Sequence, residues 1–117
     1  MKEDNLIQKK SFDFAIRIVN AYKFLKKNQE YDLSKQMLRS GTSVGANVEE
    51  AIGAYSKIDF GFKLSIAYKE ARETLYWIKL LKATNYLSEE MSKSLINDAE
   101  SICRIIGKIQ VSLKKNQ

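Results

Sequence analysis

The sequence contains no histidine and no proline, and it has one cysteine and five glycines among its 117 residues. Without histidine, the chain cannot build a Ser-His-Asp or Cys-His arrangement, an imidazole general base, or most zinc and di-iron sites. Without proline, no residue forces a helix to break. These absences favour a continuous helical protein that lacks a conventional hydrolytic active site.

Long apolar segments are also missing. The amino-terminal stretch MKEDNLIQKK has no apolar region of the kind that a signal peptide needs. Nowhere do roughly eighteen apolar residues follow one another, as a membrane-spanning helix requires. The single Cys103 cannot form an intramolecular disulfide, and its helical spacing within AESICRIIGKI predicts a small core residue. We therefore expect a cytoplasmic protein that does not bind membranes and needs no cofactor.

The residues that are present describe one globular domain covering residues 1–117. The chain is 44% hydrophobic and 29% charged, a composition typical of a folded helical protein. Lysine and arginine exceed aspartate and glutamate by 20 to 14, which makes the formal charge +6. This charge permits binding to nucleic acid through a folded surface, although ordinary cytosolic proteins are often as basic.

Apolar residues recur at helical spacing in four segments, and no strand pattern competes with them. The predicted helices cover approximately residues 11–28, 33–55, 59–84 and 88–114. Their expected N-caps are Ser11, Asp32, either Ser56 or Asp59, and Ser88. The preceding NLIQKK either extends the first helix or remains outside it. Because the connections are short, the sequence predicts an all-α, antiparallel up-down four-helix bundle.

Three of the segments show how the helices should pack. The third has a core stripe formed by Phe60, Leu64, Ala67, Ala71, Leu75, Ile78 and Leu81. The second has a stripe formed by Leu33, Met37, Val44, Val48, Ala51 and Tyr55. The first has a stripe formed by Phe14, Ile18, Ala21 and Leu25, with Phe12, Ala15, Ile16 and Val19 beside it. Since this last face is wider than one core can cover, we expect a homo-oligomer.

The stretch RSGTSVGANVEEA, residues 39–51, is unusually rich in small and polar residues. It does not match a phosphate-binding loop, because its glycines lie four residues apart, no lysine follows them and no strand precedes them. The apolar periodicity continues through it, so we predict a helix despite the ~1 kcal/mol that each glycine costs. Gly41 and Gly45 then form a flat strip where another helix can approach closely.

A polar stripe runs beside the apolar stripe of this second helix. It consists of Gln36, Ser40, Ser43, Asn47 and Glu50. One interpretation is a solvated face, and the other is a hydrogen-bonded seam between helices or subunits, because Ser and Asn are poor helix formers. On the third helix, Glu70 and Glu73 lie on the side away from the core stripe and are candidate partners for Arg39, Ser43 or Asn47.

Two motifs give the chain a resemblance to a known family. They are L-R-S-G-x-S-x-x-x-N-x-x-E-A at residues 38–51 and A-x-x-E-A-x-E-T-x-x-W-I at residues 67–78. Together they resemble the four-helix-bundle family first noticed as proteins encoded inside intervening sequences of bacterial 23S ribosomal RNA genes. The matching polar and aromatic positions are Arg39, Ser40, Ser43, Asn47, Glu50, Glu70, Glu73 and Trp77.

The resemblance implies a bundle that assembles as a ring-like homopentamer and has no established catalytic activity. A related branch is the accessory protein of diversity-generating retroelements, a basic pentameric barrel that associates with a reverse transcriptase and nucleic acid. No feature of this chain assigns it to that branch. Whether the matching residues serve the fold, the pentamer or a ligand does not follow from the match.

One flank of the third helix carries the residues of the main functional hypothesis. Lys69, Arg72, Tyr76 and Lys79, followed by Lys82 or Ala83, place cations about one turn apart with an aromatic ring between them. The hypothesis is an oligomeric protein without enzymatic activity that binds RNA or DNA. The alternative for the flank itself is a solvated basic face.

Two other functions remain open at this stage. One is a protein-binding adaptor that uses the wide apolar face of the first helix. The other is a Mg²⁺-dependent all-α nucleoside triphosphate pyrophosphohydrolase. In that enzyme, Glu70 and Glu73 would join Glu49, Glu50 and Asp98 to hold the metal, although a clear E-x-x-D motif is missing.

Overall fold

The computed structural model describes residues 2–115, with side chains described from residue 5 onward. Four α-helices make up nearly all of this range, which contains no strand. They are α1 (Lys2–Lys27), α2 (Leu33–Ile52), α3 (Lys57–Ala83) and α4 (Glu89–Lys115). The all-α prediction is therefore correct.

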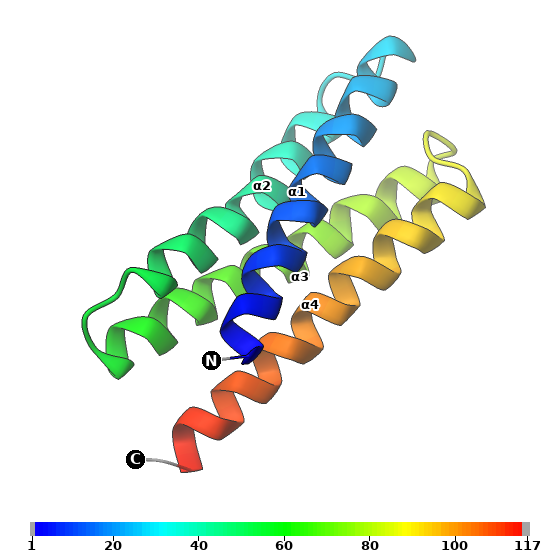
Figure 1. The fold of residues 1–117 in the computed structure, drawn as a ribbon. Helices are drawn as coiled ribbons and strands as arrows, with labels where there is room; N and C mark the ends of the chain where they lie inside the picture. The colour runs from blue at the N-terminus through cyan, green and yellow to red at the C-terminus, as the bar shows by residue number, and fades with distance from the viewer. Residues whose placement is uncertain (1, 116–117) are drawn as a thin grey trace.

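The helices form an elongated bundle with up-down connectivity (Figure 1). The connections α1–α2 and α3–α4 lie at one end, and the α2–α3 connection lies at the other end with the start of α1 and the end of α4. Each helix packs against two neighbours, most extensively α2 against α3 and least extensively α1 against α4. The principal extents are 48 × 21 × 18 Å.

The core consists of one apolar stripe from each helix. Its largest fully buried side chains are Ile7, Phe14, Ile18, Leu25, Met37, Val44, Val48, Leu64, Ile78, Leu81, Ile102 and Ile106. Burial of each such side chain is favourable by ~1.5–3 kcal/mol. The stripe predicted on α3 is buried from Leu64 to Leu81, and Phe60 packs half-buried at its end.

The start of α1 corrects the prediction that Ser11 is an N-cap. The helix begins at Lys2, and Ser11 is buried within it, where its hydroxyl donates to the carbonyl oxygen of Gln8. The reason is Ile7, which lies seven residues before Phe14 and is fully buried in the same stripe. NLIQKK therefore extends the first helix.

Both ends of α2 also differ from the prediction. Asp32 makes no side-chain capping bond. Instead the buried carboxylate of Glu30 accepts hydrogen bonds from the backbone N–H groups of Leu33 (3.1 Å) and Ser34 (2.6 Å). The helix ends at Ile52, three residues before the expected end at residue 55. Tyr55 lies in the following connection, where it is 99% exposed instead of in the core.

The other two N-caps lie where the sequence placed them. The backbone N–H of Asp59 donates to Ser56 Oγ at 3.0 Å, which decides between the two residues considered for α3. The backbone N–H of Met91 donates to Ser88 Oγ at 3.1 Å and so caps α4. None of the helices within residues 2–115 is long and apolar enough to cross a membrane.

Gly41 and Gly45 lie where α2 faces α1. A Cβ atom at Gly41 would be 2.8 Å from Ile18 Cγ2, a distance that real Cβ contacts essentially never show. A Cβ atom at Gly45 would be 3.3 Å from the backbone oxygen of Ser11. The two helices therefore approach closely along this strip.

We expect Gly45→Leu to lower the free energy of unfolding by ~1–3 kcal/mol or more, because the added side chain must push the α1 backbone away. Gly107 on α4 is the matched control, since a Cβ atom there would meet nothing within 4 Å. Gly107→Ala should raise the stability by ~0.5–1 kcal/mol through helix propensity alone. Urea denaturation followed by circular dichroism measures both. A Gly45→Leu curve that superimposes on the wild-type curve would contradict the close packing.

Candidate functional site

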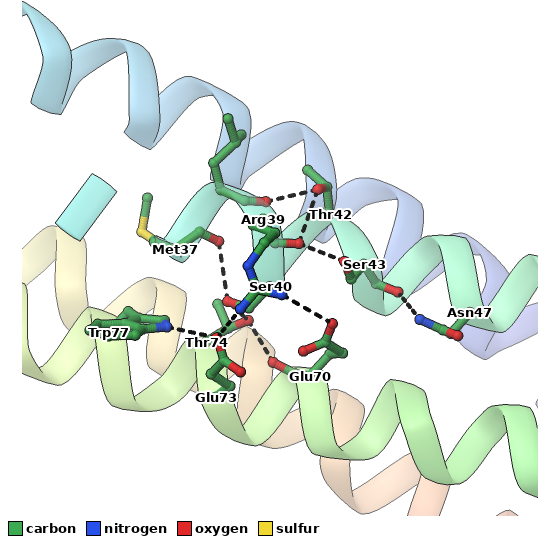
Figure 2. A network of polar contacts seen from close by, with 11 residues as sticks. Met37, Arg39, Ser40, Thr42, Ser43, Asn47, Glu70, Glu73, Thr74 and Trp77 are labelled. Carbon is green, nitrogen blue, oxygen red and sulfur yellow. Dashed lines mark hydrogen bonds and ion pairs between the residues drawn. The ribbon is translucent and has the colours of Figure 1, made fainter. Parts of the chain in front are cut away.

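A polar seam joins the outer sides of α2 and α3 (Figure 2). Arg39 reaches across from α2, with Nη2 2.7 Å from Glu73 Oε2 and Nη1 3.9 Å from Glu70 Oε2. Trp77 Nε1 donates to the same Glu73 oxygen at 3.0 Å. Because the Arg39 side chain is more than half exposed, we expect these ion pairs to add at most ~1 kcal/mol of stability.

Beneath this ion pair lies a buried pair of hydroxyl groups. Thr74 Oγ1 is 2.9 Å from Ser40 Oγ and 2.7 Å from the carbonyl oxygen of Glu70. Both residues are fully buried. Each hydroxyl offers one proton and two lone pairs, so the pair satisfies its own hydrogen bonds without water. Thr74 was not among the predicted site residues, although its place three residues after Ala71 and four before Ile78 puts it on the buried stripe.

Three other residues of the polar stripe on α2, Gln36, Ser43 and Asn47, do not reach the seam. Ser43 Oγ donates to the carbonyl oxygen of Arg39 at 2.7 Å, and Asn47 Nδ2 donates to that of Ser43 at 2.8 Å (Figure 2). These two side chains are half-buried, and Gln36 is exposed. Ser40 therefore belongs to the seam, whereas Gln36, Ser43 and Asn47 form a partly solvated face.

Glu50, at the end of the same stripe, makes its own contact with α3. Lys63 Nζ lies 2.9 Å from Glu50 Oε1. This hydrogen bond, with the attraction between the two charges, raises the pKa of Lys63 above its usual value. Lys63 therefore stays protonated at neutral pH.

The predicted basic residues of α3 take no part in the ion pairs and hydrogen bonds of the seam. Lys69, Arg72 and Lys79 are exposed, and Tyr76 between them is 58% exposed. Within the part of the chain that the structure describes, none of these three cations has a carboxylate within 4 Å. Lys82, the next cation along the helix, instead pairs with Glu89 at 3.2 Å.

Cys103 on α4 lies beside this flank. It is half-buried at the edge of the core and not inside it, which corrects the expectation of a core residue. Burial raises the pKa of its thiol, whereas the charges of Arg72 and Arg104 act to lower it. Cys103 is therefore in the thiol form at neutral pH.

The carboxylates considered for a magnesium cluster have different partners. Glu70 and Glu73 face Arg39, and Glu50 pairs with Lys63. On other faces, Glu49 accepts a hydrogen bond from Gln8 at 2.8 Å, and Asp98 pairs with Arg17 of α1. No group of three or more His, Cys, Asp or Glu residues that could hold a metal occurs among the described residues. The arrangement does not fit the pyrophosphohydrolase site.

Comparison with known proteins supplies the family. A family model described as "23S rRNA-intervening sequence protein" matches residues 3–108. The chain belongs to this family. The match confirms the resemblance drawn from the two motifs on α2 and α3, which form the two sides of the polar seam.

A solved structure is similar over almost the whole chain. It is described as a protein with unknown function from the S23 ribosomal protein family of Bacteroides thetaiotaomicron VPI-5482. The two chains share 50% sequence identity and a TM-score of 0.90, and the match covers 92% of this chain and 97% of that one. No curated protein matches the chain. The family assignment thus supports the fold and leaves the activity open.

The buried hydroxyl pair of this family member makes a specific thermodynamic prediction. Thr74→Val keeps the side-chain shape but leaves the Ser40 hydroxyl without its partner on α3, so we expect a loss of ~1–3 kcal/mol. Ser40→Ala should cost a similar amount. The double variant should lose less than the sum by ~0.5 kcal/mol or more, because the two groups interact directly. Denaturant titrations of all four proteins measure this coupling.

Thr84→Val is the matched control for this cycle. Thr84 is exposed, and its hydroxyl donates to the carbonyl oxygen of Leu80 in its own helix. Its replacement should change the stability by no more than ~0.5 kcal/mol. Strictly additive effects of Ser40→Ala and Thr74→Val would show that the pair does not link α2 to α3.

Proposed function

We propose that this protein is a non-enzymatic homo-oligomer that binds RNA or DNA through the exposed flank of α3. The observation that carries the proposal is that Lys69, Arg72 and Lys79, around the exposed ring of Tyr76, have no carboxylate within 4 Å among the described residues. Phosphate groups are the chemical partners that such a row of cations attracts, and an aromatic ring adds a surface for bases.

The distribution of charge on α3 supports this assignment. On the seam side, Glu70 and Glu73 are compensated by Arg39. On the flank, the positive charges of Lys69, Arg72 and Lys79 have no such compensation within the described residues. Cations without a carboxylate partner keep their full attraction for a polyanion, since no internal ion pair must first be broken.

The outer face of α1 supports the oligomeric part of the proposal. Phe12 is 66% exposed and Ile16 is 48% exposed, and they lie one turn apart on the side away from the core. Burial of such side chains between subunits is favourable. We propose the ring-like homopentamer that the family resemblance implies, in which repeated α3 flanks would multiply a weak local attraction.

A protein-binding adaptor is the second candidate, and the same observation on Phe12 and Ile16 favours it. In that case the apolar face of α1 would contact a different protein instead of another copy. The adaptor does not use the basic flank of α3. Measurements of mass and of nucleic-acid binding therefore separate the two functions.

We expect Phe12→Glu and Ile16→Glu, alone or together, to reduce the mass in solution toward that of the 13.5 kDa monomer. A charge on each exposed apolar position would have to be buried between subunits, which is unfavourable. Light scattering at micromolar protein concentration measures the mass. Tyr55→Glu, which changes an exposed ring in the α2–α3 connection, should leave it unaltered. A wild-type protein that is monomeric would contradict the proposed assembly.

The electrostatic part predicts a steep dependence of nucleic-acid affinity on salt. Each neutralised phosphate releases condensed counterions, so affinity should fall sharply between ~50 mM and ~200 mM salt. Replacement of Lys69, Arg72 and Lys79 by alanine should reduce the slope of log affinity against log salt concentration, by an amount that corresponds to up to about three phosphate contacts. Helicity and mass should not change, because exposed charges contribute little to stability. Fluorescence anisotropy with a labelled oligonucleotide measures the slope.

The control removes the same net charge elsewhere. Lys27, Lys35 and Lys57 are exposed and lie outside the α3 flank, and their replacement by alanine should leave most of the slope intact. Equal losses in the two triple variants would indicate a non-specific effect of net charge. Absence of any binding to RNA or DNA at ~50 mM salt would contradict the proposed function and favour the adaptor.

A further inference from the structure

The flank of α3 continues onto α4. Arg72 and Arg104, from the two helices, both lie close enough to the Cys103 thiol to act on its pKa. Farther along the same pair of helices, Gln110 Nε2 donates to the carbonyl oxygen of Gly61 at 2.9 Å. With the packing of α3 against α4, this hydrogen bond shows that the two helices run side by side (Figure 1).

α4 adds a further cation, Arg104, to the three cations of the α3 flank. Arg104 is exposed, and the described residues place no carboxylate within 4 Å of its guanidinium. The exposed Glu100 is the acidic neighbour on α4 that also acts on the Cys103 thiol. Together with Lys69, Arg72 and Lys79, the edge holds four cations against one carboxylate and keeps an excess of positive charge.

Two tyrosines of α3 lie along this row. Tyr76 packs against Trp77 in a T-shaped arrangement, with ring centroids 5.1 Å apart and an interplanar angle of 73°. Trp77 is itself held by its hydrogen bond to Glu73. The ring of Tyr76 is therefore supported from the seam side and open to solvent. Tyr68, two turns earlier and next to Lys69, is also exposed.

The two exposed rings favour the binding of an unpaired strand over that of a duplex. Tyr68 and Tyr76 are eight residues apart, which is ~12 Å along a helix. Bases in a duplex stack about 3.4 Å apart and expose only their edges, so they offer no open face to such rings. Bases of an unpaired strand can turn outward and stack on aromatic side chains, each stack adding ~1–3 kcal/mol.

The α4 surface at Gly107 is open. Gly107 lies between Cys103 and Gln110 on α4, and Tyr68 lies between Gly61 and Arg72 on α3. A Cβ atom at Gly107 would meet nothing within 4 Å, so no side chain fills the space there.

We propose that the α3–α4 edge, formed by Lys69, Arg72, Tyr76 and Lys79 of α3 with Arg104 of α4, is a binding site for an unpaired RNA or DNA strand. The proposal rests on the proposed function and deepens it by naming the strand form that is bound. The cations hold the phosphates, the guanidinium groups of Arg72 and Arg104 approach the strand from its two sides, and Tyr76 stacks on a base.

The experiment compares strand forms in the full-length protein at ~50 mM salt, where phosphate contacts are strong. Its probes are a labelled oligouridylate, the matching oligothymidylate and a hairpin duplex of equal length. Fluorescence anisotropy should show tighter binding of both single strands than of the hairpin. RNA and DNA strands should bind alike, because stacking and phosphate contacts do not use the 2′-hydroxyl.

Tyr76→Ala carries the decisive comparison. It should weaken single-strand binding five-fold or more while changing hairpin affinity less than two-fold, as expected for the loss of one stacked base. Tyr76→Phe keeps the flat ring and should bind like the wild type. The matched control is Tyr31→Ala, which removes an exposed tyrosine from the α1–α2 connection and should have no effect.

A second variant protects this test against a folding defect. Tyr76 touches Trp77, so circular dichroism and the emission of this single tryptophan report whether Tyr76→Ala keeps the fold. If Tyr76→Ala does not keep the fold, Tyr76→Leu replaces it in the test. Leucine keeps apolar bulk against Trp77 but presents no flat ring, so we expect the same loss of single-strand affinity.

Arg104→Ala tests whether α4 belongs to the site. It should reduce the salt dependence of single-strand binding by about one phosphate contact. An unchanged slope would contradict the part of the site assigned to α4.

The possible results separate this inference from the proposed function. Wild-type protein that binds none of the probes would overturn both. Binding of all probes with equal affinity, unchanged or reduced equally by Tyr76→Ala, would overturn the single-strand site and leave the nucleic-acid function standing.

Discussion

α1 can lie against α2 as closely as it does only because Gly41 and Gly45 present no side chain to it. Ile18 occupies the space that a Cβ atom at Gly41 would need, and the same α1 stripe enters the core through Phe14. Because the side of α1 that carries Phe14 and Ile18 faces inward, Arg17 pairs with Asp98 on α4 and Phe12 lies on the outer surface. One steric constraint thus sets which face of α1 is available to a partner.

α2 uses its unusual composition on two sides. The glycines serve the contact with α1, whereas Ser40 and Arg39 serve the contact with α3. The glycines and Ser40 lower the intrinsic stability of the helix, so the helix depends on its neighbours. α3 is divided in a similar way. Glu70 and Glu73 face α2 and pair there with Arg39, while Lys69, Arg72 and Lys79 take no part in these ion pairs.

The sequence predicted the helical stripes well because their periodicity follows from helix geometry alone. It was less reliable at helix ends, where local chemistry offers alternatives. Asp32 had the residue type and position of an N-cap, yet Glu30 reaches the free N–H groups from outside the helix. Ser11 also resembled a cap, but Ile7 supplies an earlier core contact that extends α1. Each error came from a tertiary contact that outweighed a local preference.

The sequence by itself determined that the chain is helical, that four apolar stripes meet in one core, and that histidine-based chemistry is absent. It also determined which residues share a helix flank, and so it placed Lys69, Arg72, Tyr76 and Lys79 together. Only the tertiary structure decided that Thr74 meets Ser40, that Ser43 turns back to its own helix, and that α4 lies beside the basic flank. The reason is that periodicity gives the angular position of a side chain on its own helix, whereas the group it contacts depends on the rotation and offset of the neighbouring helix.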